Sequence, residues 1–528
     1  MTEHDSRSIA RIDWILLGVL LVLVLPMRVW VLHNTEVCAR DGIGYIRYAL
    51  MFEQLTVSET LQKNHQHPGY PALVYLVSQP IRAWQGETPD AMVLSAQLVN
   101  LMAALVLVFP MYFLGRQFYH RGISFGATLL YQYLPISSAH LSDAISEPVY
   151  LVFLVSAVLQ MVQTMRERCI MRGILCGTFA GLAYLVRPEG ALVLLGVAGA
   201  LCVGQMIPAW RVTWQRVVSC GLATVGTAIL VGATYAIIIG GFTNKPSVND
   251  TMKAKGVATA MLSDNDFLFA TTFAPSDLRT VRLQRSVTAV AMEITQGLHY
   301  VGVIPALLGG LAFFRSLRGS LGFWAVAIYA AVHTTVLVML AMSVSYVSDR
   351  HVMILVVLAS YLVIAAIDEL PRRLLAKRGE GTPTSWTRSP IVWSLLIAGV
   401  FFAACLPKAM QHLHGNRAGN HAAGLWLAER VVDGDVILDN HNWSHYYAGH
   451  LFQEGREPTV PSGFQPTCYV VVTRSRDPEL AKERDEKFLT PDARVVYHWP
   501  TDAAVANARV IVYAQKRNAG MHPWKKGP

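Results

Sequence analysis

The sequence predicts an α-helical polytopic membrane protein of the order of eleven spans, followed by a small soluble α/β domain. Three composition values and one change of pattern predict this class. The 528 residues are 53% hydrophobic and only 15% charged, with a mean hydropathy of +0.37, whereas soluble proteins carry about 25% charged residues. After about residue 407, long apolar runs give way to short alternating segments.

Apolar stretches long enough to cross a bilayer recur through the first four hundred residues. A transmembrane helix needs about 20 mostly apolar residues. Eleven stretches come close to this length, at 14–32, 91–114, 122–139, 149–165, 170–186, 190–207, 217–239, 299–314, 321–342, 351–367 and 390–406. The first is interpreted as a retained span, because no small-residue cleavage site follows it.

The segment Tyr70–Trp84 is the main alternative to this count. It is apolar but only fifteen residues long, and it contains Pro71, Pro80 and Arg82. That length is more typical of an interfacial or re-entrant segment than of a span.

Loop charges provide a separate test of the topology. With 70–84 outside, the loops 115–121, 166–172, 208–216, 315–319 and 368–389 carry fourteen Lys and Arg residues on one side. The short opposite loops carry two, Arg187 and Arg350. The positive-inside rule then places the N-terminus in the cytoplasm and the C-terminal domain outside, most simply in a bacterial inner or plasma membrane. The formal charge of +9 therefore reflects topology rather than nucleic-acid binding.

Three segments outside the membrane are large: 33–90, 240–298, and the region after 406, which we expect to form a separate domain over 407–528. In this domain the pattern predicts helices and strands. The expected helices are Ala423–Val432 and Pro478–Phe488, and the expected strands are Asp435–Asp439, Cys468–Thr473, Val495–His498 and Arg509–Ala514. Most of the seven cysteines lie in apolar runs, and a bridge between Cys38 and Cys468 stays open.

Ionisable residues gather at the predicted outer face. They are Asp41 after the first span, Asp143 and Glu147 after the third, Arg187 and Glu189 after the fifth, and Asp349 and Arg350 after the ninth. Asp143 and Glu147 would share one face if their segment were helical. Each residue taken alone fits a cap or an interfacial anchor, but ionisable groups near membrane depth tend to line functional cavities.

Several short motifs at this face resemble the GT-C superfamily of polyprenyl-phosphate-sugar-dependent glycosyltransferases. The resemblance covers about residues 10–410 and is nearest to the protein O-mannosyltransferase, aminoarabinose transferase and Rgt-type lipopolysaccharide transferase branch. The motifs are Arg40-Asp41-Gly42 with Tyr45 and Tyr48-Ala49, His67-Pro68-Gly69-Tyr70-Pro71, Ser142-Asp143 with Ser146-Glu147-Pro148, Leu185–Gly190, and Ser348-Asp349-Arg350-His351.

The resemblance implies inverting transfer of a sugar from a polyprenyl-phosphate carrier to an acceptor outside the cytoplasm. By family position Asp41 is the candidate general base, which takes the proton of the acceptor hydroxyl. The developing charge of the lipid phosphate needs fixed cations. Arg350 is the first candidate and Arg187 the second, while Lys253 and Lys255 are candidates to close over the donor or are solvated loop charges.

Other roles stay open at this stage. Asp143 and Glu147 would hold a divalent ion, orient the acceptor or pair with Arg187, and carboxylate ligands favour Mg²⁺ or Mn²⁺ over Zn²⁺. His67, Tyr45 and Glu189 are candidates for contact with the acceptor or the phosphate. The neighbour of Asp41 is Gly42 rather than a second acidic residue, which weakens the interpretation of that loop as a metal-binding pair.

Two other function classes compete with glycosyl transfer. A lipid or solute transporter, including a flippase, would place ionisable residues near the bilayer midplane in broken helices. Most of the predicted span interiors lack such charges. An assembly protein with a degenerate membrane part would lose Asp41 or the arginines, which this chain keeps. The sequence leaves the donor sugar, the acceptor and the role of the C-terminal domain undetermined.

Overall fold

Helices make up most of the chain, as its composition predicts. The computed structural model describes residues 10–516 except 208–209, 211–212, 247, 250–278, 345, 377–389, 440, 450–465 and 475–488. Up to the last predicted span the helices are α1 (Arg11–His33), α2 (Arg40–Gln54), α3 (Val57–Lys63), α4 (Gly69–Gln85), α5 (Pro89–Arg116), α6 (Arg121–Tyr133), α7 (Pro135–Ser142), α8 (Glu147–Glu167), α9 (Ile170–Val186), η1 (Pro188–Ala191), α10 (Leu192–Met206), α11 (Trp214–Ile239), α13 (Arg279–Gly297), α14 (Val303–Leu317), α15 (Leu321–Val344), η3 (Asp349–Val352), α16 (Met353–Ala376) and α17 (Pro390–Ala409).

Eight helical stretches in the described part of the chain are long and apolar enough to cross a membrane. They are Arg11–His33, Pro89–Arg116, Glu147–Glu167, Pro188–Met206, Trp214–Ile239, Leu321–Val344, Asp349–Pro371 and Val392–Ala409. The shorter apolar helices α9 and α14 lie between them in the sequence. The chain is therefore a multi-pass integral membrane protein, and every one of the eleven predicted stretches is helical over most of its length.

The segment that competed with this count is the helix α4. It has seventeen residues with Pro80 inside, and Arg82 near its end pairs with Glu87 at 2.8 Å. It is not among the helices that reach the length and apolarity of a span, which agrees with the interfacial prediction.

The chain divides into two compact units. The first comprises residues 1–33, 51–73 and 99–411, and the second comprises 34–50, 74–98 and 412–528. Helices α2, α4 and α5 each contribute residues to both units. The predicted division into a membrane domain that ends at residue 406 and a separate domain over 407–528 stays a prediction.

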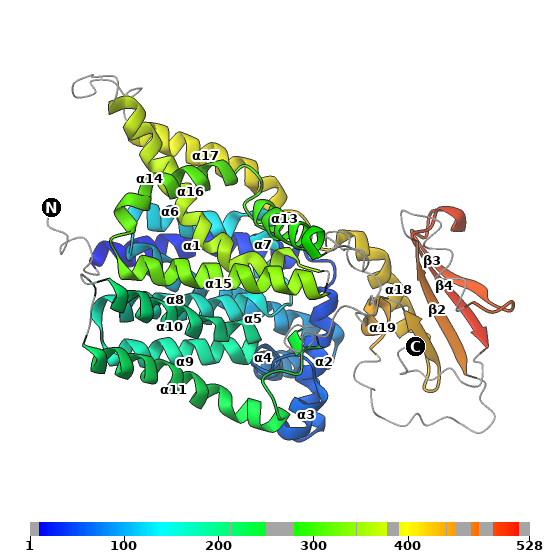
Figure 1. Ribbon diagram of the computed structural model, residues 1–528. Coiled ribbons are helices and arrows are strands. Elements are labelled where there is room, and N and C mark those ends of the chain that lie inside the picture. The colour runs from blue at the N-terminus through cyan, green and yellow to red at the C-terminus, as the bar shows by residue number, and fades with distance from the viewer. Residues whose placement is uncertain are drawn as a thin grey trace. The chain divides into compact units, whose positions relative to one another are not determined.

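In the first unit, α8, α9, α10 and α11 run side by side (Figure 1). The contact of α9 with α11 is made through Gly173, Gly177 and Gly181, which are four residues apart. A Cβ atom on Gly177 would lie 2.0 Å from Oγ1 of Thr227 and 2.1 Å from the carbonyl oxygen of Thr224. Small residues at this spacing let transmembrane helix backbones approach closely.

The predicted span 122–139 is broken into α6 and α7 at Leu134, and Pro135 begins the second helix. Proline has no N–H group, so the hydrogen-bond ladder cannot continue through it. Arg28 of α1 is 1% exposed and bonds to one carbonyl group just before this break and to another within α7. Its guanidinium donates to the carbonyl oxygens of Gln132 and, at 2.8 Å, Ser138.

The second unit contains a four-stranded sheet in the order β1-β2-β4-β3. Its elements are η5 (Gly415–Arg417), α18 (Ala418–Ala428), β1 (Val436–Asp439), α19 (Trp443–Tyr447), β2 (Thr467–Thr473), β3 (Arg494–Trp499), η8 (Val505–Asn507) and β4 (Val510–Lys516). Strand β1 pairs with β2 in parallel, and the other pairs are antiparallel. The four predicted strands are confirmed to within about two residues.

Helix α18 covers this sheet through Ala423 and Leu427, which pack on Ile437, Val471 and Val512. It begins five residues before the predicted helix and ends four residues earlier. The second predicted helix, Pro478–Phe488, lies outside the described residues.

Residues far apart in the sequence complete the second unit. The indole of Trp443 donates to the carbonyl of Cys38 at 2.8 Å, and the hydroxyl of Tyr446 donates to the carbonyl of Pro89 at 2.8 Å. Cys38 and Cys468 are buried thiols and form no disulfide.

Candidate functional site

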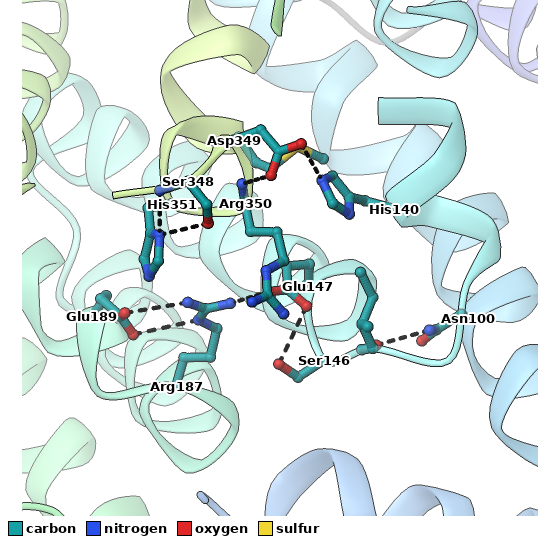
Figure 2. Close-up of polar contacts among 12 residues, drawn as sticks. Asn100, His140, Ser146, Glu147, Arg187, Glu189, Ser348, Asp349, Arg350 and His351 are labelled. Atoms are coloured by element: carbon teal, nitrogen blue, oxygen red, sulfur yellow. Dashed lines mark hydrogen bonds and ion pairs between the residues drawn. The ribbon is translucent and has the colours of Figure 1, made fainter. Parts of the chain in front are cut away.

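Three hairpins of the first unit bring ionised side chains together around Glu147 (Figure 2). Glu147 is the first residue of α8, and its side chain is 3% exposed. Its Oε1 atom forms an ion pair with Nη1 of Arg187 and lies 3.9 Å from Nε of Arg350. A buried carboxylate is thus shared by two guanidinium groups.

Arg187 is the more firmly held of the two arginines. It follows the last residue of α9, and its side chain is 7% exposed. Besides Glu147 it contacts the carboxylate of Glu189 in η1, with 3.4 Å between Nη2 and Oε1. Its guanidinium carbon also lies 5.6 Å from the ring centroid of Tyr150, within the range of a cation–π contact.

Arg350 belongs to η3, and its side chain is 27% exposed. Beside it, Asp349 forms an ion pair with His140 of α7, with 3.2 Å between Oδ2 and Nε2. Burial by itself would lower the pKa of His140, but the charge of Asp349 raises that pKa above its usual value. On α13, burial and then the charge of Asp349 raise the pKa of Glu293 to about 7.

The turn that carries Arg350 is fixed by His351. The Ser348 backbone N–H lies 3.2 Å from Nδ1 of His351, and the Ser348 hydroxyl lies 3.0 Å from the same nitrogen. The carbonyl oxygen of His351 accepts a hydrogen bond from Nε2 of His333 on α15 at 3.0 Å. Arg350 therefore lies in a turn that is closed by the contacts between Ser348 and His351 and is tied to α15 through His333.

The loop between α7 and α8 is held from α5. The side-chain amide of Asn100 donates to the carbonyl oxygens of Asp143 and, at 2.8 Å, of Ile145. The Asp143 carboxylate accepts from the N–H of Ala144 at 2.7 Å. Residues 143–146 are not helical, so Asp143 and Glu147 do not lie on one helix face.

Lys245 completes the group, and the sequence reasoning did not single it out. Its ammonium charge acts on Glu189, Arg187, Glu147 and Arg350. Burial lowers the pKa of Lys245, while the charge of Glu189 opposes that change. We call Glu147, Arg187, Glu189, Lys245 and Arg350 the charge cluster. The sequence feature that could have pointed to Lys245 is the basic composition of the loop after α11.

The other predicted site residues fall in three places. His67 lies in the first unit and bonds to Tyr184 and Thr243. Asp41 and Tyr45 lie on α2 in the second unit, Asp41 in its first turn and both partly buried. Lys253 and Lys255 lie outside the described residues.

The charge cluster does not suit a divalent cation. Among the described residues, no group of three or more His, Cys, Asp or Glu side chains is arranged to hold a metal ion. Glu147 is already paired with two guanidinium groups, and Asp143 caps a backbone N–H. Hard cations such as Mg²⁺ require several oxygen ligands. Three of the five side chains in the charge cluster are themselves positively charged and would repel such a cation.

No protein-family model and no curated protein sequence matches the chain. The fold is similar to that of ArnT from Cupriavidus metallidurans in the apo state, with a TM-score of 0.51, 13% identity, and coverage of 95% of this chain and 97% of that chain. It is also similar to the archaeal oligosaccharyltransferase AglB from Archaeoglobus fulgidus in complex with an inhibitory peptide and a dolichol-phosphate. That comparison has a TM-score of 0.50 and 13% identity, and it covers 86% of this chain but only 62% of the archaeal chain. ArnT and AglB are both GT-C proteins, and the chain therefore has the GT-C fold.

Proposed function

We propose that the protein is an inverting membrane glycosyltransferase that moves a sugar from a polyprenyl-phosphate carrier to a hydroxyl group of an extracytoplasmic acceptor. The acceptor class is a glycolipid, a polysaccharide or a protein. The observation that carries the proposal is the charge cluster, a set of buried and half-buried ionised groups in which cations outnumber carboxylates.

The charge of this cluster suits the donor. Arg187, Arg350 and Lys245 supply three positive charges against the two negative charges of Glu147 and Glu189, which leaves one positive charge in excess. A polyprenyl-phosphate sugar is a phosphodiester with one negative charge, so its binding would neutralise the cluster. Guanidinium groups also match phosphate oxygens in geometry.

The reaction increases the negative charge on the phosphate. As the acceptor oxygen bonds to the anomeric carbon, the bond from that carbon to the phosphate oxygen breaks, and its electron pair stays on the lipid phosphate. Fixed cations stabilise such developing charge most strongly where water is excluded. Arg350 and Arg187 fill this role in our proposal.

We assign the general base to Asp41. It takes the proton that the acceptor hydroxyl loses during attack. The support for this role is the resemblance of Arg40-Asp41-Gly42 to the family motif and its place in the first turn of α2. In the same proposal Tyr45 and Glu189 contact the acceptor or the phosphate, and Asp143 orients the loop that carries Glu147.

Structures of the archaeal neighbour contain ligands of the same chemical kinds. The archaeal oligosaccharyltransferase was solved with a dolichol-phosphate and an inhibitory peptide, and also tethered to an acceptor peptide. For this chain we propose a lipid-linked donor and a C-terminal domain on the acceptor side of the membrane.

The test is a transfer assay with the full-length protein in proteoliposomes and a panel of polyprenyl-phosphate sugars. We expect transfer by the wild type and a loss of about 10²- to 10⁴-fold in kcat for Asp41→Asn, as for removal of a general base. Glu53→Gln is the matched control, because Glu53 is an exposed carboxylate on the same helix. Equal rates for Asp41→Asn and wild type would refute the base assignment. Lipid or solute transport without any transfer would support a transporter instead.

A further inference from the structure

His67 is almost fully enclosed, and both of its ring nitrogens bond to protein. The residue is 2% exposed, and its ring lies between Tyr184 and Tyr235 with centroid distances of 5.1 and 4.9 Å. Nδ1 lies 2.6 Å from the carbonyl oxygen of Tyr184, and Nε2 lies 2.9 Å from Oγ1 of Thr243. Neither nitrogen is available to a substrate.

These partners define the protonation of the ring. A carbonyl oxygen only accepts, so Nδ1 of His67 carries the hydrogen. Nε2 of a neutral ring then accepts, and the hydroxyl of Thr243 is its donor. The free lone pairs of Thr243 Oγ1 accept the backbone N–H of Lys245 at 3.1 Å. The chain of donors runs in one direction, from Lys245 through Thr243 to the ring, and from the ring to Tyr184.

The backbone around Thr243 is anchored on both sides. The hydroxyl of Tyr184 donates to the carbonyl of Phe242, and the side-chain amide of Asn249 donates to the carbonyl of Thr243 at 3.0 Å. The side-chain amide of Asn244 donates to the carbonyl of Asn64 at 3.2 Å. These bonds fix the backbone position from which the Lys245 side chain extends.

The glycine after His67-Pro68 permits this close packing. A Cβ atom on Gly69 would lie 2.8 Å from the carbonyl oxygen of Leu185 and 2.8 Å from Cγ2 of Val186. These residues end α9, directly before Arg187. The motif His67-Pro68-Gly69 is therefore built against the same turn that supplies Arg187 to the charge cluster.

The charges agree with a neutral ring. Burial and then the nearby charge of Lys245 lower the pKa of His67 to about 4. A protonated ring would place a second positive charge next to Lys245 and would take away the acceptor that Thr243 uses.

We propose that His67 and Thr243 are positioning residues that fix Lys245 as a third cation for the donor phosphate, with His67 acting as a neutral, Nδ1-protonated imidazole. This inference rests on the proposed function, because it deepens the phosphate site described there.

Steady-state kinetics of the full-length protein in proteoliposomes test the proposal. We expect Lys245→Met to raise the KM for the polyprenyl-phosphate sugar by on the order of 10- to 100-fold, the range for loss of one hydrogen bond to a charged group. The KM for the acceptor should stay unchanged. Lys63→Met is the control, since Lys63 is an exposed lysine at the end of α3, and it should match the wild type.

The positioning role predicts a specific pattern in the neighbouring variants. Thr243→Val and His67→Phe should each raise the KM for the donor by about tenfold, while Thr243→Ser, which keeps the hydroxyl, should stay within about twofold of wild type. The double variant Thr243→Val/Lys245→Met should equal Lys245→Met alone, because both changes act through one cation. Multiplicative effects, or a Thr243→Ser variant as impaired as Thr243→Val, would overturn the proposal.

Binding of radiolabelled polyprenyl monophosphate separates this proposal from the proposed function. Weaker binding by Lys245→Met, in a protein that transfers no sugar, would support the phosphate site and refute the transferase. Active transfer with unchanged donor KM and unchanged binding in Lys245→Met would refute the role of Lys245 and leave the transferase intact.

Discussion

At the scale of single residues, the two arginines beside Glu147 differ in how firmly they are held. Arg187 is 7% exposed and is bonded to Glu147 and Glu189, whereas Arg350 is 27% exposed and lies 3.9 Å from Glu147. A buried ion pair gains little net free energy once the desolvation of both ions is counted. In our proposal an incoming phosphate draws Arg350 away from Glu147, whose carboxylate stays paired with Arg187.

The neutral His67 gives the protein a predicted pH dependence. Its pKa is about 4 in the folded state and 6.5 in an exposed chain. Between these values the unfolded chain binds a proton that the folded protein does not, so stability falls as the pH drops from about 6.5 to about 4. The contribution of this one group is at most about 3 kcal/mol.

Thermal unfolding of the protein in nanodiscs measures this effect. We expect the melting temperature of the wild type to fall more steeply over that range than that of His67→Phe, which has no proton to bind at this position. The charges that act on His67 are Lys245, Glu189 and Arg187, and all of them are unchanged in the variant. Parallel pH profiles for the two proteins would contradict a buried neutral ring.

Sequence motifs identified residues that the structure brings together, while their catalytic roles stay predictions. The short loops placed Glu147, Arg187, Glu189 and Arg350 on one side, and the structure brings these four together. Lys245 was missed because its role depends on the fold of a long loop, which no local pattern records.

At the scale of elements, proline and glycine explain the break between α6 and α7 and the close packing of α9 on α11, which hydropathy did not predict. Pro135 divides a predicted span into α6 and α7, a break that the sequence could have indicated. Arg28, which donates to the carbonyl oxygen of Gln132 beside the break, comes from α1, more than a hundred residues away. Local periodicity finds the helices but not the side chains that cap them from another helix.

The packing of α9 on α11 leads to a stability prediction. We expect Gly177→Ala to lower the melting temperature by several degrees, because its Cβ atom would lie 2.0 Å from Oγ1 of Thr227. Gly226→Ala on α11 is the control, since a Cβ atom there meets nothing within 4 Å. Thermal unfolding of both variants in the same nanodiscs is the measurement, and equal melting temperatures would show that α9 and α11 do not pack closely at this point.

At the scale of the whole molecule, composition and hydropathy predicted the class, the helical spans and the strands of the final region. They did not predict that residues 34–50 and 74–98 group with the chain after 411. That grouping depends on contacts such as the one from Trp443 to Cys38, between residues some four hundred positions apart. Hydrophobic patterning reports which residues are buried, but not which distant segment buries them.

We propose that the charge cluster binds the phosphate of a lipid-linked sugar donor. The most direct test is a cryo-EM map of the full-length protein in nanodiscs with bound polyprenyl monophosphate. We expect phosphate density in contact with Arg350, Arg187 and the ammonium group of Lys245. Phosphate density at another place, with Glu147 still paired to both arginines, would contradict it.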